Sequence, residues 1–111
     1  MKVFVHHVYE YKKGLRNLVL HTMSTSMVSQ AVARLQKGEI DFYIQHVTAT
    51  KCNIFFGAKE CVEIVKKICI RPLNELSAEE DFMLGIMLGY DRKVQCERYL
   101  SRSSMLNAIA S

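Results

Sequence analysis

Two short segments, Ile40–Gln45 (Ile-Asp-Phe-Tyr-Ile-Gln) and Cys52–Gly57 (Cys-Asn-Ile-Phe-Phe-Gly), decide the fold of this chain. In both segments apolar residues recur at every second position, which is the period of a β-strand with a buried face. Residues 48–51 between them read Thr-Ala-Thr-Lys and predict a hairpin connection, although the Asn-Gly turn signal is missing. The middle of the chain therefore predicts two neighbouring antiparallel strands.

The segments before this hairpin predict one more strand and two helices. Lys2–Tyr9 is rich in β-branched and aromatic side chains, which favours a strand. Apolar residues then recur at helical spacing over Leu15–Thr22, so we expect a helix that opens at Gly14. A second helix over Val28–Leu35 is expected to end at Gly38, because glycine is common just after a helix.

The segments after the hairpin predict three helices. Ala58–Ile68 is amphipathic, with one apolar and one charged face. Ser77–Glu80 reads Ser-Ala-Glu-Glu, a capping box that opens a helix through Phe82–Leu88, and Asp91 is expected to cap a last helix. Between the first two helices, Cys69–Arg71 predicts either a short edge strand or an extended connection.

Together these elements predict an α+β fold in a single domain, residues 1–111. We expect a three-stranded antiparallel sheet, with a fourth strand left open, a ferredoxin-like order at the front, and about five helices on one face. The apolar pattern weakens toward the end of the chain, so residues 103–111 are expected to fray. This fold class serves many functions and does not identify one.

Composition and charge exclude several classes of protein. The chain is 50% hydrophobic and 23% charged, which is typical of a chain that folds. Its net charge of +4 is spread along the sequence rather than gathered in a basic patch, so we expect no nucleic-acid partner. The longest apolar run, Phe82–Leu88, is far shorter than the roughly 20 residues of a membrane span, and the apolar start is too short for a signal peptide. We therefore expect a cytoplasmic protein without membrane contact.

The spacing of cysteine and histidine predicts neither a disulfide nor a bound metal. The chain has four cysteines, at Cys52, Cys61, Cys69 and Cys96. Predicted core residues flank them, and without an export signal we expect reduced, mostly buried thiols. No close pair of ligands has the spacing of a structural zinc site, and a site assembled across strands from His7, His46 and Cys52 is disfavoured. We expect no cofactor and assign no catalytic residue.

The densest group of polar side chains is His6–Arg16, which reads His-His-Val-Tyr-Glu-Tyr-Lys-Lys-Gly-Leu-Arg. It lies at the expected junction of the first strand and first helix, where free N–H groups and the helix dipole favour an anion. The candidate ligand-binding residues of such a site are His7, Glu10, Lys13, Gly14 and Arg16. Two other interpretations stay open. His7 and Glu10 could be a general acid–base pair, or the segment could be solvated surface in which Glu10 itself meets the helix N–H groups. We favour solvated surface.

The segment Phe82–Leu88 is apolar on every side, so a helix there must be covered on every side. Gly85 within it disfavours the helix by about 1 kcal/mol relative to alanine, a cost that a close helix crossing would offset. We expect a homodimer built on this segment. The alternative is that the segment lies between the sheet and the last helix. On that last helix Arg98 and Arg102 are one turn apart, and their repulsion predicts an acidic partner elsewhere in the chain.

Five blocks of the sequence form a combined signature: His6–Thr22, Cys52–Gly57, Glu79–Gly85, Gly89–Asp91 and Gln95–Tyr99. Together they resemble a small bacterial family known only as a domain of unknown function, and the resemblance covers nearly the whole chain. It implies a compact α+β domain with about three strands and five helices that forms a homodimer. It also implies genes beside a flavodoxin, and hence a redox-partner or accessory role, and it brings no catalytic residues.

Two hypotheses of function follow. The first is a non-enzymatic, dimeric interaction or accessory domain that serves a flavodoxin-like redox partner. Flavodoxins are acidic, and a net charge of +4 suits an acidic partner. The alternative is a small anionic-ligand or enzymatic site at the junction of the first strand and first helix.

Overall fold

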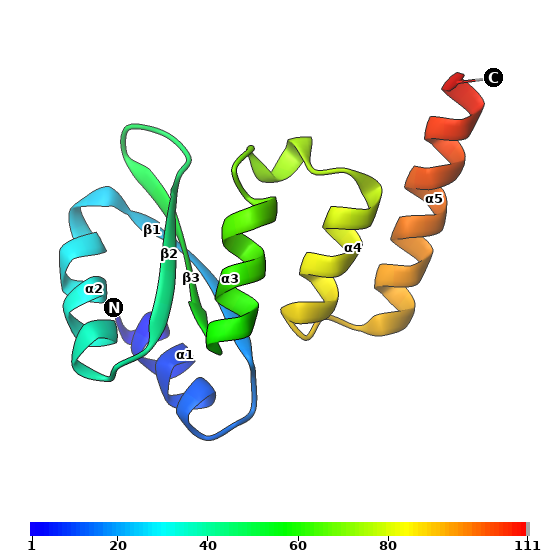
Figure 1. The fold of residues 1–111 in the computed structure, drawn as a ribbon. Coiled ribbons are helices and arrows are strands. Elements are labelled where there is room, and N and C mark those ends of the chain that lie inside the picture. Colours follow the sequence, from blue (N-terminus) through cyan, green and yellow to red (C-terminus); the bar gives the residue numbers. More distant parts are fainter. Residues whose placement is uncertain (111) are drawn as a thin grey trace.

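The structure, a computed structural model, describes residues 1–110, with side chains for residues 1–104 (Figure 1). The elements in chain order are α1 (Lys2–Lys12), β1 (Leu18–Ser24), α2 (Val28–Lys37), β2 (Asp41–His46), β3 (Lys51–Gly57), α3 (Lys59–Ile68), α4 (Ala78–Met87) and α5 (Arg92–Ala110). Short 3-10 turns precede α2 and α4, at Thr25–Met27 and Leu73–Glu75. The predicted α+β class is confirmed.

The three strands form an antiparallel sheet in the order β1-β3-β2, so the last strand in chain order lies at the centre. β2 and β3 pair as the predicted hairpin, with Ile44 opposite Ile54. On its other side β3 pairs with β1, with Val19 opposite Phe56. Cys69–Arg71, considered as a fourth strand, forms a turn.

Helices cover both faces of the sheet (Figure 1). We had expected them on one face only. The core under α1 and α2 contains Phe4, Val8, Val19, Leu35, Ile54 and Phe56. The core under α3 and α4 contains Leu18, Phe55, Val62, Val65, Leu84 and Leu88. Successive residues of a strand point to opposite faces. When helices cover both faces of a sheet, its central strand is therefore apolar on both sides.

The first element is a helix, so the strand predicted for Lys2–Tyr9 is wrong. α1 buries Phe4 and Val8, which are one turn apart, and Tyr11 packs against the same core. This i, i+4, i+7 spacing places all three side chains on one helix face. It outweighs the strand preference of the β-branched residues between them, which depends strongly on context.

Gly14 closes α1 and does not open the next element. Its N–H donates to the Tyr11 carbonyl over 3.0 Å, and the Leu15 N–H donates to the Glu10 carbonyl over 3.0 Å. These two bonds form a Schellman motif, and Gly14 has the positive φ of 77° that this motif needs. The helix expected for Leu15–Thr22 is therefore also wrong.

β1 replaces that helix because both of its faces are buried. Leu18 and Val19 are consecutive, and each is fully buried on a different side of the sheet. Two consecutive buried residues, together with Leu15 and Thr22, reproduce helical spacing by coincidence. A strand buried on both faces therefore gives the same short pattern as a helix.

The capping signals predicted for α4 and α5 are confirmed. The Glu80 N–H donates to Ser77 Oγ over 3.1 Å, and the Ser77 N–H donates to Glu80 Oε1 over 2.9 Å, which completes a capping box. Asp91 Oδ2 accepts the Val94 N–H over 3.0 Å at the start of α5. α5 continues to Ala110, through most of the tail in which we expected fraying, and residue 111 lies outside the described residues.

α4 lies between α3 and α5 (Figure 1), whereas the alternative that we had weighed against a dimer placed it between the sheet and the last helix. Leu84 and Leu88 pack into the core beneath α3. Gly85 faces α5, where a Cβ atom would lie 2.0 Å from Gln95 Oε1. The cost of Gly85 in the helix is thus offset by a close crossing within the chain.

Candidate functional site

Three of the predicted site residues come together at the end of α1. Glu10 Oε1 lies 3.2 Å from His7 Nδ1, and Arg16 Nη1 lies 3.4 Å from the same nitrogen. Arg16 reaches α1 because the turn at Gly14 reverses the chain. Since Nδ1 carries either a proton or a lone pair, it can donate to Glu10 or accept from Arg16, but not both.

A second histidine, His21 of β1, completes this cluster and was not among the predicted residues. Its ring lies 5.5 Å from the ring of His7 and 5.7 Å from that of Phe4, measured between centroids. Burial lowers the pKa of His21, and repulsion from His7 lowers it further. No sequence pattern indicated that His21 would lie here, because it belongs to a segment that we expected to be helical.

The other two predicted site residues lie apart from this cluster. Lys13 Nζ stands over the ring of Tyr9, 5.4 Å from its centroid, and Gly14 closes the helix. The site was expected at the N-terminus of a helix, but these residues lie at the C-terminal end of α1. The dipole there favours cations, and carbonyl groups replace the N–H groups that an anion would meet.

The cluster already contains its own anion. Glu10 lies 3.2 Å from His7 and 3.8 Å from His6, and its side chain is about three-quarters buried. A bound phosphate or carboxylate would have to compete with Glu10 for the same positive groups. The geometry is therefore that of an internal polar network in which His7 joins Glu10 of α1 to Arg16, just before β1.

A cysteine–histidine pair, which no sequence pattern indicated, lies across β2 and β3. Cys52 Sγ is 3.3 Å from His46 Nδ1 and 3.6 Å from Thr25 Oγ1, because residues 46 and 52 are opposite each other in the strand register. Cys52 has no exposed surface, so a substrate does not reach its sulfur in this structure. Burial raises the pKa of the Cys69 thiol to about 11 and also raises that of Cys61.

The cysteines of the described chain are free: two are buried, one is half-buried and Cys96 is exposed. Within that part of the chain, no three His, Cys, Asp or Glu side chains gather as a metal ion would require. The thiols therefore act here as core and surface side chains.

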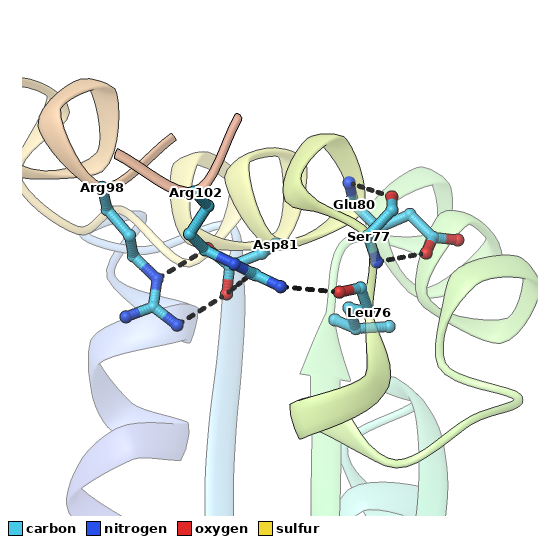
Figure 2. A network of polar contacts seen from close by, with 6 residues as sticks. All are labelled: Leu76, Ser77, Glu80, Asp81, Arg98 and Arg102. Carbon is cyan, nitrogen blue, oxygen red and sulfur yellow. Dashed lines mark hydrogen bonds and ion pairs between the residues drawn. The ribbon is translucent and has the colours of Figure 1, made fainter. Parts of the chain in front are cut away.

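A second polar cluster fastens α5 to α4 (Figure 2). Arg98 donates to both oxygens of Asp81, over 2.7 and 3.1 Å, and Arg102 donates to the Leu76 carbonyl over 2.9 Å while its Nη1 lies 3.4 Å from Asp81. The predicted acidic partner of the two arginines is thus Asp81. The hydrogen bond from Arg98, followed by the charges of both arginines, lowers the pKa of Asp81.

The same two helices expose an apolar surface, which we call the hairpin face. It consists of Phe82, Met83, Cys96, Tyr99 and Leu100. These residues line a groove of about 430 Å³, in which the rings of Phe82 and Tyr99 lie 5.5 Å apart. Met83 is 43% exposed and Leu100 is 63% exposed. None of the helices in the described chain has the length and apolarity to cross a membrane.

Comparison with known proteins gives a family but no activity. No curated protein matches the chain. The model of one family, described as a protein of unknown function (DUF2023), matches residues 2–102 of the 111 residues. The match covers every element of the sheet, α1 to α4, and the part of α5 that holds Arg98 and Arg102. The chain therefore belongs to the DUF2023 family of proteins of unknown function.

Proposed function

We propose that this protein is a non-enzymatic interaction domain that forms a homodimer through the hairpin face. The observation that carries the proposal is the exposure of large apolar side chains, Met83 and Leu100 above all, on two helices whose other sides are packed. Contiguous apolar surface of this kind is typical of protein contacts. Association of the face with a second copy would cover it.

The composition of the hairpin face suits contact with itself. In a two-fold interface each residue meets the same surface of the partner copy, so like charges at the centre would repel. The centre of this face is apolar and aromatic, and its charged neighbour Glu79 accepts a hydrogen bond from the Tyr99 hydroxyl over 3.3 Å. Aromatic residues and methionine are enriched in the cores of such interfaces.

The homodimer is tested by the mass of the protein in solution. Light scattering after size exclusion at micromolar concentration should give about twice 12.8 kDa. Leu100→Glu should give a monomer with unchanged circular dichroism, because Leu100 is exposed within one chain and its charge would meet its own copy. The matched control is Ile70→Glu, which changes a 76% exposed residue outside the hairpin face and should leave the dimer intact. A monomeric wild type, or identical masses for both variants, would contradict the proposal.

We further propose an accessory role toward an acidic, flavodoxin-like redox protein. The resemblance described above and the net charge of +4 support this role. Calorimetric titration with a purified flavodoxin should give a dissociation constant that rises steeply with salt, since attraction between opposite charges is screened. No heat at low salt would exclude such a partner.

A further inference from the structure

Three polar side chains form a row across the sheet, on the face that α3 and α4 cover. Thr22 of β1 and Gln45 of β2 lie on either side of Asn53 in the strand register. Thr22 Oγ1 lies 2.6 Å from Asn53 Oδ1, and Asn53 Nδ2 lies 3.0 Å from Gln45 Oε1. Asn53 and Gln45 are only 6% and 8% exposed. Buried polar groups need partners, so the direction of each hydrogen bond in the row matters.

The backbone fixes that direction. Gln45 Nε2 donates to the carbonyls of Cys69, over 3.1 Å, and Arg71, over 3.0 Å. The amide nitrogen of Gln45 must therefore face the turn, and its oxygen must face Asn53. It follows that the Asn53 nitrogen donates to Gln45 and that the Asn53 oxygen accepts the hydroxyl proton of Thr22.

This direction leaves one edge of the Asn53 amide unused. The nitrogen has a second N–H and the oxygen a second lone pair, and neither has a partner among residues 1–104. Because the neighbours of Asn53 lie on either side along the sheet, the planar amide presents these two groups together and away from the sheet. A donor beside an acceptor is the edge with which asparagine recognises adenine in DNA-binding proteins.

Asn53 lines a groove of about 600 Å³ together with Thr22 and Gln45, and this volume is within the range of small-molecule sites. The polar row forms its floor, and His46 and the turn Pro72–Glu75 form its walls. Of its described lining side chains, only His46 and Glu75 are titratable, and both belong to the walls. The floor is therefore neutral and favours a neutral ligand.

We propose that this groove binds a neutral ring compound whose edge carries an N–H donor beside a carbonyl or ring-nitrogen acceptor, paired with the Asn53 amide. A purely structural role of the row would be to fasten the turn after α3 to β2. Gln45 makes two bonds to the turn, and the Tyr43 hydroxyl of β2 adds a third, to the Cys69 carbonyl over 3.3 Å. Asn53 makes none of them, so that role leaves the free edge of Asn53 unexplained.

Uracil and 1,3-dimethyluracil distinguish the two roles. Uracil presents its N3–H beside the carbonyl at C4, and methylation of N3 removes the donor while the ring and the carbonyls remain. In the ¹⁵N-labelled protein, uracil should shift the Asn53 side-chain amide resonances in a saturable way, and 1,3-dimethyluracil should not. No saturable shift with uracil, or equal binding of the two compounds, would overturn the proposal.

Variants place the binding in the groove. Asn53→Leu removes the edge and should abolish uracil binding, which in this variant is followed by the backbone amide resonances of residues 73–75 in the groove wall. Because this change also breaks the row, Asn74→Trp provides a second test. Asn74 is exposed on the wall of the groove. An indole there should weaken uracil binding by about tenfold or more and leave the row intact. Gln36→Trp, an exposed position on α2 outside the groove, is the matched control and should bind as the wild type does. Equal binding by Asn74→Trp and Gln36→Trp would show that the site lies elsewhere and would reject the proposal.

Discussion

The sheet region, residues 1–68, and the α4–α5 hairpin are stabilised in different ways. The sheet has a buried core on each face, and side chains such as Phe55 and Phe56 have no exposed surface. α5, in contrast, packs on α4 across the crossing at Gly85 and through a partly exposed cluster around Asp81. Burial of apolar surface contributes far more than exposed ion pairs do. This contrast indicates that most of the folding free energy resides in the two buried cores, to which Leu84 of α4 and the adjoining Leu88 contribute, and that α5 opens at the lowest cost.

The largest effect is expected from a truncation at the centre of the sheet region. The ring of Phe56 lies 5.4 Å from that of Phe4 and 6.3 Å from that of Tyr11. Phe56→Ala should lower the free energy of unfolding by about 3–5 kcal/mol, the usual cost of such a cavity. Urea denaturation followed by circular dichroism measures it. Val94→Ala, at a 54% exposed position of α5 outside the hairpin face, is the control and should lower the free energy of unfolding by about 0.5 kcal/mol or less. Equal losses in the two variants would remove the contrast.

A smaller effect is expected from Asp81, which holds α5 through Arg98 and Arg102. Hydrogen bonds to charged groups contribute about 1.5–3 kcal/mol to stability. Because these arginines are partly exposed, we expect Asp81→Asn to lower the free energy of unfolding by only about 1 kcal/mol. Hydrogen exchange should become faster in α5 and stay unchanged in β3. Glu97→Gln, which removes only the surface pair with Lys93, should change neither rate. Faster exchange in both regions would mean that the two unfold as one unit.

Acid should affect the two regions in different pH ranges. Burial lowers the pKa of His21, so its contribution to stability is present above about pH 6.5 and is lost as the pH falls through the lower folded pKa. The pKa of Asp81 is lowered by Arg98, so its contribution is present above about pH 4 and is lost below that. Melting temperatures between about pH 8 and pH 3 should show a weaker acid dependence near pH 6 in His21→Gln, and near pH 3 in Asp81→Asn. If His21→Gln left the dependence near pH 6 unchanged, or Asp81→Asn left that near pH 3 unchanged, these pKa directions would be refuted.

The smallest effect is expected at the end of α1. Glu10 already lies 3.2 Å from His7, the residue that Arg16 contacts, so added phosphate should leave the melting temperature of the wild type unchanged. In Glu10→Gln the internal anion is lost, and phosphate should then stabilise the protein in proportion to its concentration. A rise in the wild type that Arg16→Ala abolishes would instead demonstrate the anion site considered from the sequence.

Most of the elements could be predicted because their signals are local. The alternation around Ile44 and Ile54, the capping box at Ser77 and the cap at Asp91 are each complete within a few residues. At the start of the chain we predicted a strand followed by a helix, and the structure has a helix followed by a strand. The reason is that Leu18 and Val19 are buried on opposite faces of the sheet. A short window of sequence does not reveal the two layers of helices that bury them.

The candidate sites could be predicted only where their residues are close in sequence. His7 and Glu10 are three residues apart, and their pairing was one of the interpretations left open. His21 joins them only because β1 is a strand. The row of Thr22, Asn53 and Gln45 depends on the register of three strands, which no pattern within one segment specifies.

The position of β3 has a consequence for folding while the chain is being synthesised on the ribosome. β1 and β2 do not pair with each other, because β3 lies between them and pairs with both. Until residues 51–57 have emerged, the nascent chain has two strands without a common partner and two helices, α1 and α2, without a sheet to cover. A truncated chain that ends at Thr50 should therefore remain unfolded, because it lacks the strand that joins the other two.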